Sequence, residues 1–385
     1  MSLTKTPANI RRLRRWLSGQ GAHLPGLKVI ELDQGGRQAV ASRRLPAGSL
    51  VLHLPRGLLM DVDAARRSRT GQALLGRYSE VSDTALLAAH LLDVGRHGGI
   101  WSRYCQTLPT GFPEHPLFYS AEQMQELQGS YIVRVVRRHQ ARQRREHMRL
   151  CESQPEALSF TQEAHALAWA TVLTRRFDVR LDSIKTIAMI PFADMPDHAL
   201  EPNLQWASES SRGFFLTAAR DIEAGTPLTL RYWRQCNGLT LATYGFSLEL
   251  NPHNVAELRF PEMPGIQTPT PQTGNASSVV RDGQRVFMVT ARPKDARMQE
   301  LLGYLQGVAG SLDGALTLLK AACQQRLAAF STSQQEDQLL LTRPDLPLWL
   351  RFVVRVRHDE KTVLHAIEAL NAKQLFGVAQ SDTAP

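Results

Sequence analysis

Cysteine is scarce in this chain, with only four in 385 residues. The four stand at positions 105, 151, 236 and 323, so no pair has the close spacing of a metal-binding motif. So few cysteines in so long a chain do not form a disulfide framework either. We therefore expect no bound metal, and we expect the protein to reside in a reducing compartment, the cytoplasm.

Long apolar stretches are also missing. No run reaches the ~18 apolar residues of a membrane-spanning helix, and residues 1–20 combine four arginines with no apolar stretch like that of a secretory signal. Three motifs are absent as well: G-x-G-x-x-G after a strand, the P-loop, and G-x-S-x-G. These absences argue against a membrane protein and against dinucleotide, nucleoside-triphosphate and serine-hydrolase chemistry.

The composition that is present is typical of a globular protein with a sizeable core. Hydrophobic residues make up 43% and charged residues 21%. Lysine and arginine number 45 against 36 acidic residues, which leaves a formal charge of +9. Such an excess favours an acidic partner, or it simply keeps the protein in solution.

Seven arginines are concentrated on one expected helix, between Tyr131 and Leu150. The simpler interpretation, which we favour, is a helix face that points into solvent. The alternative is a docking surface for nucleic acid or for an acidic protein. No aromatic residue after Tyr131 is interleaved with these arginines, so base stacking is not supported and a nucleic-acid partner is not expected.

The order of the expected elements predicts an α+β fold, because strands and helices are segregated instead of alternating. Strands are expected at 27–32, 39–42, 50–54, 186–190, 214–218 and 227–232. Helices are expected at 9–19, 83–94, 121–149 and 162–175, and from Pro293 to about Phe376. We predict an N-terminal helix within 1–25, a domain of short strands over 26–250 with a helical insertion at about 61–177, a mainly helical domain over 255–376, and a tail at 377–385.

Three segments together resemble one protein family. They are Gly35–Ala41 followed by Leu45–Gly48 and Leu54–Arg56; Ile190–His198 followed by Asn203; and Ala218–Gly225 followed by Tyr232, Asn237 and Tyr244-Gly245-Phe246. In this order and spacing they resemble the SET domain, in the branch that includes the Rubisco large-subunit lysine methyltransferase and the actin-histidine methyltransferase. Further similar residues lie in the insertion, at Trp101, Tyr104, Leu108-Pro109 and Trp169-Ala170, and in a C-terminal substrate-binding domain, at Ser333–Asp337, Arg355–Arg357 and Glu360-Lys361.

The resemblance implies a SET-type fold and a protein N-methyltransferase that uses S-adenosylmethionine. It assigns the catalytic role to Tyr244, which would orient the substrate nitrogen, and it places Tyr232 in the same site. Phe177 is expected either in the core or in the wall of the substrate channel. The residues that the resemblance assigns to the cofactor are Gly36, Arg37, Gln38, Arg175, Asp194, Asp197 and His198. The simpler readings are that Tyr244 is a core aromatic beside a turn glycine and that His198 is structural.

Methyl transfer to a nitrogen is mostly a positioning problem. The nitrogen must lose its proton, and presenting a lysine neutral at pH 7 costs about 4–5 kcal/mol. A narrow apolar channel reduces that cost because it desolvates the ammonium form. A tyrosine hydroxyl at the base of the channel can then orient the amine.

This chain departs from the family pattern at four positions. Gln38 replaces a second glycine, Arg37 stands where an apolar residue is usual, Asp197 replaces an asparagine, and Trp233 replaces a glycine. Three interpretations follow. The leading one is a protein-lysine methyltransferase, because the resembled histidine-specific member lacks a tyrosine at the position of Tyr244. The alternatives are a protein-histidine methyltransferase and an inactive SET-type binding scaffold, which the changes at Gln38 and Asp197 would explain.

Overall fold

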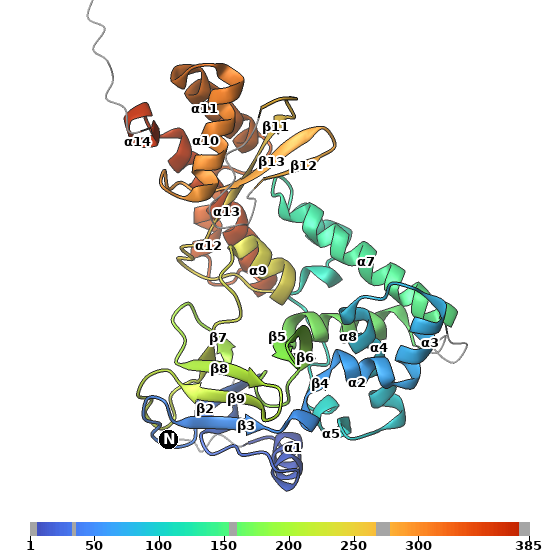
Figure 1. Cartoon of the computed structure of the whole chain (residues 1–385). Helices are drawn as coiled ribbons and strands as arrows, with labels where there is room; N and C mark the ends of the chain where they lie inside the picture. Colours follow the sequence, from blue (N-terminus) through green and yellow to red (C-terminus); the bar gives the residue numbers. More distant parts are fainter. Residues whose placement is uncertain (1–5, 33–35, 154–159, 267–277, 377–385) are drawn as a thin grey trace, which may run out of the picture. The chain divides into compact units, whose positions relative to one another are not determined.

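A computed structural model of the chain describes residues 6–32, 36–153, 160–266 and 278–376 (Figure 1). The chain divides into two compact units: Met1–Phe112 with His139–Arg234, and Pro113–Arg138 with Gln235–Pro385. This grouping differs from the expected domain bounds, because Pro113–Arg138 was expected within the helical insertion of the first domain. Tyr131, Ile132 and Val136 are buried in the same core cluster as Val353 and Val356, and this packing explains the grouping. The expected tail at 377–385 lies outside the described residues.

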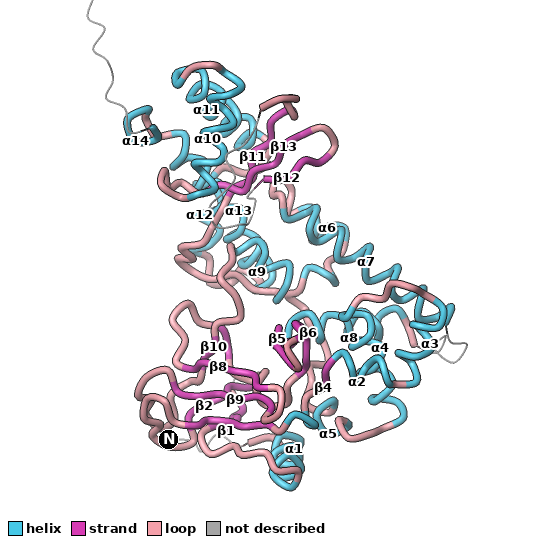
Figure 2. The backbone as a smooth tube through the Cα atoms, in the orientation of Figure 1, coloured by secondary structure: helices cyan, strands magenta, loops and turns pink. Residues whose placement is uncertain are grey.

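The first unit is built on short strands that pair as small sheets (Figure 2). The strands are β1 Leu27–Glu31, β2 Arg37–Ala41, β3 Leu50–Leu54, β4 Met60–Asp61, β5 Arg176–Leu181, β6 Ile184–Met189, β7 Asp197–His198, β8 Leu204–Glu209, β9 Gly213–Ala218 and β10 Thr229–Leu230. β1 pairs with β2, the order β3-β9-β8 forms a second sheet, and β4-β6-β5 forms a third, all antiparallel. β7 and β10 pair in parallel.

Helices fill the sequence between the two groups of strands. The helical elements of this unit are α1 Ala8–Gly19, η1 Arg56–Leu58, α2 Val62–Arg67, α3 Arg69–Arg77, α4 Asp83–His97, α5 Ser102–Cys105, most of α7 Ile132–Ser153, and α8 Gln162–Arg175. α4 begins where the Ser82 hydroxyl accepts from Ala85 N at 3.1 Å, and α8 begins where Thr161 accepts from Ala164 N at 3.1 Å. α8 packs on α4 and runs directly into β5, so its last residue, Arg175, is held at the edge of the strands.

Two sets of contacts join segments of this unit that are far apart in the sequence. β3 pairs with β9 at Leu50↔Thr217. Asn203, which is 5% exposed, donates to Pro227 O at 2.8 Å and accepts from Thr229 N at 2.8 Å. Because a buried amide is costly unless its donors and acceptors are satisfied, Asn203 holds the segment after β7 against the segment that leads into β10.

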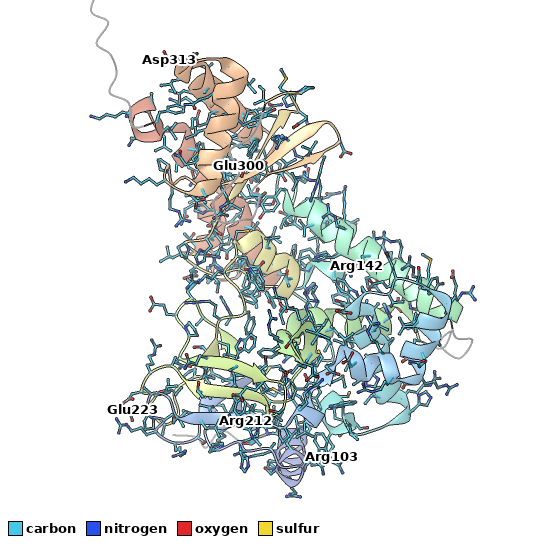
Figure 3. The ribbon with its side chains drawn as sticks, in the orientation of Figure 1. Arg103, Arg142, Arg212, Glu223, Glu300 and Asp313 are labelled. Carbon is cyan, nitrogen blue, oxygen red and sulfur yellow. The ribbon has the colours of Figure 1, made fainter. Side chains whose placement is uncertain are left out.

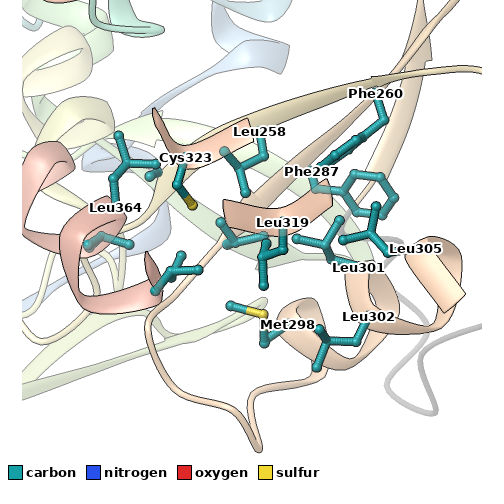
Figure 4. Close-up of a cluster of buried hydrophobic side chains, with 14 of the residues drawn as sticks. Leu258, Phe260, Phe287, Met298, Leu301, Leu302, Leu305, Leu319, Cys323 and Leu364 are labelled. Carbon is teal, nitrogen blue, oxygen red and sulfur yellow. The ribbon is translucent and has the colours of Figure 1, made fainter. Parts of the chain in front are cut away.

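The second unit combines a small sheet with a helical block. Its elements are η2 Pro116–Phe118, α6 Ala121–Gln125, the start of α7, α9 Asn237–Tyr244, β11 Ala256–Pro261, β12 Ser278–Arg281, β13 Gln284–Val289, α10 Ala296–Ala309, α11 Leu312–Ala328, α12 Gln334–Thr342, α13 Leu348–Glu368 and α14 Ala372–Phe376. The antiparallel sheet, in the order β11-β13-β12, was not expected from the sequence. Its Leu258 and Phe287 pack with Met298, Leu301 and Leu319 in one buried cluster (Figure 4).

Buried charges join the helices of the second unit. Asp337, fully buried, accepts from Lys361 Nζ at 2.6 Å, from Arg357 Nη2 at 2.9 Å and from Thr332 Oγ1 at 2.9 Å. On the same face of α13, the Glu360 carboxylate accepts from Ser130 Oγ and lies 3.6 Å from Arg326 Nη2. Burial raises the pKa of Glu360 to about 8, although Ser130 and Arg326 partly offset this rise.

The raised pKa of Glu360 predicts a pH-dependent stability. Between its ordinary value of ~4.3 and about 8, the unfolded chain loses this proton while the folded protein keeps it. Stability should therefore fall as the pH rises through this window, by up to ~1.4 kcal/mol per pH unit, and should level off above it. Glu360→Gln should flatten that slope, as measured by urea unfolding followed by circular dichroism across the window.

The matched control for this variant is Glu368→Gln at the partly exposed end of the same helix, which should keep the wild-type slope. Equal slopes for wild type and Glu360→Gln would contradict a protonated Glu360 in the folded protein.

Candidate functional site

Asp194 is the centre of a buried polar cluster in the first unit. Its side chain is 1% exposed, and its Oδ2 accepts from Tyr104 Oη at 2.9 Å and from Arg175 Nη1 at 3.2 Å. Arg175 Nη1 also donates to the Asp194 main-chain oxygen at 2.9 Å. The structure thus joins the insertion, the end of α8 and the segment after β6 at one point.

Two atoms of this cluster are left without partners. Among the described residues, neither Asp194 Oδ1 nor Arg175 Nε has a hydrogen-bond partner, although both are buried. Buried polar atoms are nearly always satisfied, so an unsatisfied acceptor and donor side by side indicate a place for a polar ligand. The backbone conformation also indicates a functional site. Phe192, two residues before Asp194, is fully buried and has φ +68°, a left-handed conformation that costs a side chain about 1–3 kcal/mol and is often found at functional sites.

Arg37 extends this cluster from the β1–β2 hairpin. Its Nη2 donates to Thr107 O at 2.7 Å. Burial lowers the pKa of Arg37, Arg175 lowers it further, and Asp194 partly offsets both, so the two guanidinium groups and the carboxylate act on one another. Gly36 precedes it with φ +89°, and among the described residues beyond its chain neighbours no atom lies within 4 Å of a Cβ built there, so a left-handed backbone and not close packing favours glycine. Gln38 is half-buried in β2, opposite Ile30.

His198 and Tyr232 form a second group on β7 and the segment after β10. Tyr232 N donates to His198 Nδ1 at 3.0 Å, so that nitrogen is unprotonated and the neutral ring carries its proton on Nε2. Burial lowers the pKa of His198, and the nearby Arg231 adds to this, which favours the neutral ring. The Tyr232 hydroxyl donates to Pro196 O at 2.8 Å. Both side chains are therefore oriented by the main chain of the neighbouring segment.

Charge links this second group to the Asp194 cluster. Burial lowers the pKa of Arg175, but Asp194, Tyr104 and Tyr232 together raise it above its usual value, so Tyr232 lies within electrostatic reach of the guanidinium. Asp197 is exposed at the start of β7. Its partial desolvation raises its pKa, and Arg175 partly counteracts that. The structure thus brings together Arg37, Arg175, Asp194, Asp197 and Tyr232 from four separate segments.

Phe177 and Tyr244 are the remaining predicted site residues. Phe177 on β5 makes edge-to-face contacts with Trp206, at 5.8 Å between ring centroids, and with Phe214, at 5.1 Å. These contacts make it part of an aromatic group, and its role as a channel wall stays a prediction. Tyr244 belongs to the second unit, and its catalytic role also stays a prediction.

The local structure holds Tyr244 in one place. It is the last residue of α9, and Gly245 ends that helix with φ +83° and a hydrogen bond from its N to Leu241 O at 2.9 Å. A Cβ on Gly245 would lie 3.1 Å from the Cα of His115, and the His115 ring contacts Thr243 O at 3.1 Å. Glycine is therefore required after Tyr244 both for its conformation and for close packing.

Sequence reasoning missed the part that Tyr104 plays. This fully buried tyrosine had been noted only as one similar residue in the insertion, with no function attached. Burial and the Asp194 charge raise the pKa of its hydroxyl well above the usual value, so it stays a hydrogen-bond donor. The Trp101-x-x-Tyr104 spacing was the available signal, but nothing in the sequence connects Tyr104 to a residue 90 positions later.

The described part of the chain contains neither a metal-ligand cluster nor a membrane-spanning helix. There, no three His, Cys, Asp or Glu side chains are grouped so that they could hold a metal ion. None of the described helices combines the length and apolar character needed to cross a membrane.

Comparisons with known proteins agree on one family. The SET domain profile matches residues 36–233, and the profile for Rubisco LSMT substrate-binding matches residues 313–364. The actin-histidine N-methyltransferase of Mus musculus is 25% identical over 398 residues, and that of Xenopus tropicalis is 24% identical over 400 residues. Each alignment covers 91% of this chain, but this chain spans only 66% of the mouse protein and 68% of the frog protein.

Solved structures show the same fold. The SET domain of LSMT bound to lysine and AdoHcy superposes with a TM-score of 0.72 at 18% identity, and Rubisco LSMT bound to AdoMet superposes with 0.71 at 18% identity. Each superposition covers 94% of this chain and 91% of the other. At this identity, the likeness establishes the fold.

Proposed function

This chain belongs to the SET-domain family, and from that membership we propose that it is an S-adenosylmethionine-dependent protein N-methyltransferase. The family resemblance and the α+β fold with a helical C-terminal region, both predicted from the sequence, are confirmed. The observation that carries the proposal is the pair of unsatisfied buried atoms, Asp194 Oδ1 and Arg175 Nε, in the cluster that the family pattern assigns to the cofactor.

The charges of the cluster fit this cofactor. S-adenosylmethionine supplies a transferable methyl group on a positively charged sulfur, and it carries a carboxylate and an ammonium group. The guanidinium groups of Arg175 and Arg37 suit the carboxylate, because the planar fork can bind two oxygens. Asp194 and Asp197 balance these two positive charges, so a molecule with groups of both signs meets no large net charge. Arg175 is the guanidinium that acts on Asp197, whereas Asp194 and Glu31 act on Arg37.

We further propose that the acceptor is a lysine of another protein. Tyr244 supports this choice, because it stands where the family places the tyrosine that orients an amine. A histidine acceptor is the second candidate, since the mouse and frog relatives are actin-histidine N-methyltransferases. An inactive binding scaffold is the third candidate, because Gln38 and Asp197 depart from the family pattern.

Each residue has a distinct task in the proposed reaction. Tyr244 would aim the nitrogen, an interaction that matters most in the transition state. Tyr232 would position the segment Pro196–His198 because its hydroxyl donates to Pro196 O. Asp194 and Arg175 would hold the cofactor in register through their shared contacts. As part of the same proposal, the four scattered cysteines fit a cytoplasmic protein.

The proposal is tested with whole-cell lysate and S-adenosylmethionine that carries a labelled methyl group. The labelled proteins are digested, and mass spectrometry identifies the modified residue. Methyl-lysine supports the full proposal. Methyl-histidine would support the methyltransferase activity but identify the acceptor as histidine instead of lysine. Cofactor binding without any labelled protein would favour the scaffold.

Arg175→Gln should weaken S-adenosylmethionine binding by about 10- to 100-fold, the effect of losing a charged hydrogen bond. Isothermal titration calorimetry measures the affinity, and thermal unfolding verifies the fold. Arg176→Gln is the matched control, because the neighbouring side chain donates to Thr84 Oγ1 at 3.3 Å instead of joining the cluster. The control should bind within about twofold of wild type. Unchanged affinity in a folded Arg175→Gln protein would remove this residue from the site.

A further inference from the structure

A hollow of about 610 Å³ lies in the first unit, and the family activity gives it no role. It is bordered by α2 and α3, by the segment before α4, and by α7. Four arginines line it: Arg66 from α2, and Arg142, Arg145 and Arg149 from α7. Figure 3 labels Arg142 on α7.

Two acidic residues line this hollow, the exposed Glu80 and the buried Glu146. Glu146 is 8% exposed and accepts from Arg142 Nε at 2.9 Å, from Ser82 Oγ at 2.7 Å and from Trp169 Nε1 at 2.7 Å. Both carboxylate oxygens of Glu146 are therefore already hydrogen-bonded within the protein. Arg142 and Glu146 neutralise each other, and Arg66, Arg145 and Arg149 remain against Glu80.

Those three guanidinium groups have few partners. Within the described ranges, Arg145 has no ion pair or hydrogen bond, and Arg149 has no carboxylate partner. Arg149 donates to the main-chain oxygen of Glu80 at 3.2 Å and lies over the Tyr78 ring at 5.1 Å. Arg66 meets Asp83 at 3.7 Å in a pair whose side chains are both 45% exposed. The lining holds four arginines against two glutamates, Glu80 and Glu146, so the hollow carries a net positive charge.

The spacing along α7 concentrates that charge on one side. Positions 142, 145 and 149 are separated by three and four residues, so the side chains lie on one face of the helix. Like charges at this spacing destabilise a helix. Arg142 is held by Glu146, whereas Arg145 and Arg149 are exposed and have no carboxylate partner among the described residues. An anion bound among them would replace this repulsion with attraction.

We propose that this hollow is a binding site for a compact organic phosphate with several negative charges. Guanidinium forks match the oxygens of phosphate groups, and the volume falls in the range of small-molecule sites, about 300–1,000 Å³. The arginines converge from two elements on one hollow instead of following a row along the surface. That arrangement suits a compact ligand better than an extended acidic chain, and Leu75 and Val81 supply an apolar wall for its organic part.

The test is calorimetry on the full chain with inorganic tripolyphosphate as the probe, at low ionic strength. Arg145→Gln and Arg66→Gln should each weaken binding by about tenfold, the effect of one charged hydrogen bond. Arg144→Gln is the control, because Arg144 is exposed on the same helix but does not line the hollow. It should bind within about twofold of wild type. Circular dichroism should show the same helix content in all three variants.

Three results would overturn the proposal. One is no binding of tripolyphosphate to the wild-type protein. Another is equal weakening by Arg144→Gln, which would indicate general attraction to a basic helix. The third is a polyglutamate peptide that binds as tightly as tripolyphosphate and with the same dependence on Arg145, which would assign the hollow to an acidic protein segment.

Discussion

Replacing Tyr244 with phenylalanine should reduce methyl transfer by about 10²- to 10³-fold, the usual effect of losing one preorganised contact to the reacting groups. The affinity for S-adenosylmethionine should stay within about twofold of wild type, because the ring remains and only the hydroxyl is lost. The hydroxyl is proposed to aim the nitrogen, so its removal affects the transition state more than the ground state. Turnover with labelled cofactor and calorimetry on the same preparation measure the two quantities.

Tyr232→Phe is the informative comparison, because the Tyr232 hydroxyl is committed to Pro196 O at 2.8 Å and acts through the main chain. We expect a smaller loss of turnover there, together with some loss of cofactor affinity. Unchanged turnover in Tyr244→Phe would contradict the catalytic assignment. Lost cofactor binding in that variant would instead identify Tyr244 as a residue that shapes the cofactor site.

Asp337→Asn should destabilise the protein by about 3–5 kcal/mol, the typical effect of removing one partner from a buried ion pair. The carboxylate is fully buried and serves both Lys361 at 2.6 Å and Arg357 at 2.9 Å. An asparagine fills nearly the same volume but leaves Lys361 without its ion-pair partner and Arg357 with only Glu126, whose side chain is 43% exposed. The helices α12 and α13 pack against each other, so the loss should appear as a lower urea midpoint for the second unit.

Asp345→Asn is the matched control in the same part of the chain. Asp345 pairs with Arg343 at 2.8 Å, but both side chains are more than half exposed, so water can replace the pair. We expect its unfolding midpoint to equal that of the wild type. If Asp337→Asn also unfolds at the wild-type midpoint, the buried charges do not hold α12 against α13.

Elements with strong local signals could be predicted from the sequence. The helix at 162–175 is observed with the predicted bounds, because Thr161 caps its start and the residues that follow are mostly good helix formers. The strand at 50–54 is likewise observed as predicted. In both cases the information lies in neighbouring residues, and tertiary packing agrees with it.

Elements decided by distant residues were mispredicted. A single helix was expected at 121–149, but α6 ends at Gln125 and α7 begins at Ile132. Between them Gly129 has φ +80°, and a Cβ there would lie 2.7 Å from the Cα of Phe330, about 200 positions away in the sequence. The strand expected at 227–232 is only Thr229–Leu230.

Some strands were missed because their patterns are weak. β5 alternates exposed and buried positions only in its second half, and β8 is mostly exposed. Periodicity therefore gives little signal for either strand.

The candidate site was likewise predicted only in part. The family pattern located Arg37, Arg175, Asp194 and Asp197 one by one, and the structure brings them together. The donors that hold Asp194 could not be predicted, because Tyr104 lies 90 residues earlier and Arg175 lies 19 residues earlier on a different element. Contacts between residues so far apart in the sequence can be identified only in the folded structure.

The pairing of β3 with β9 also has a consequence for synthesis of the protein. Leu50 finds its partner only when Thr217 has been made. At ribosomal rates of about 5–20 residues per second, that delay is roughly 10–30 seconds. During this time Val51, Leu52 and Leu54, all fully buried in the finished protein, emerge without the strand that covers them. The nascent first unit is therefore a substrate for chaperones that bind exposed apolar strands, until translation has passed the last strand of its sheet.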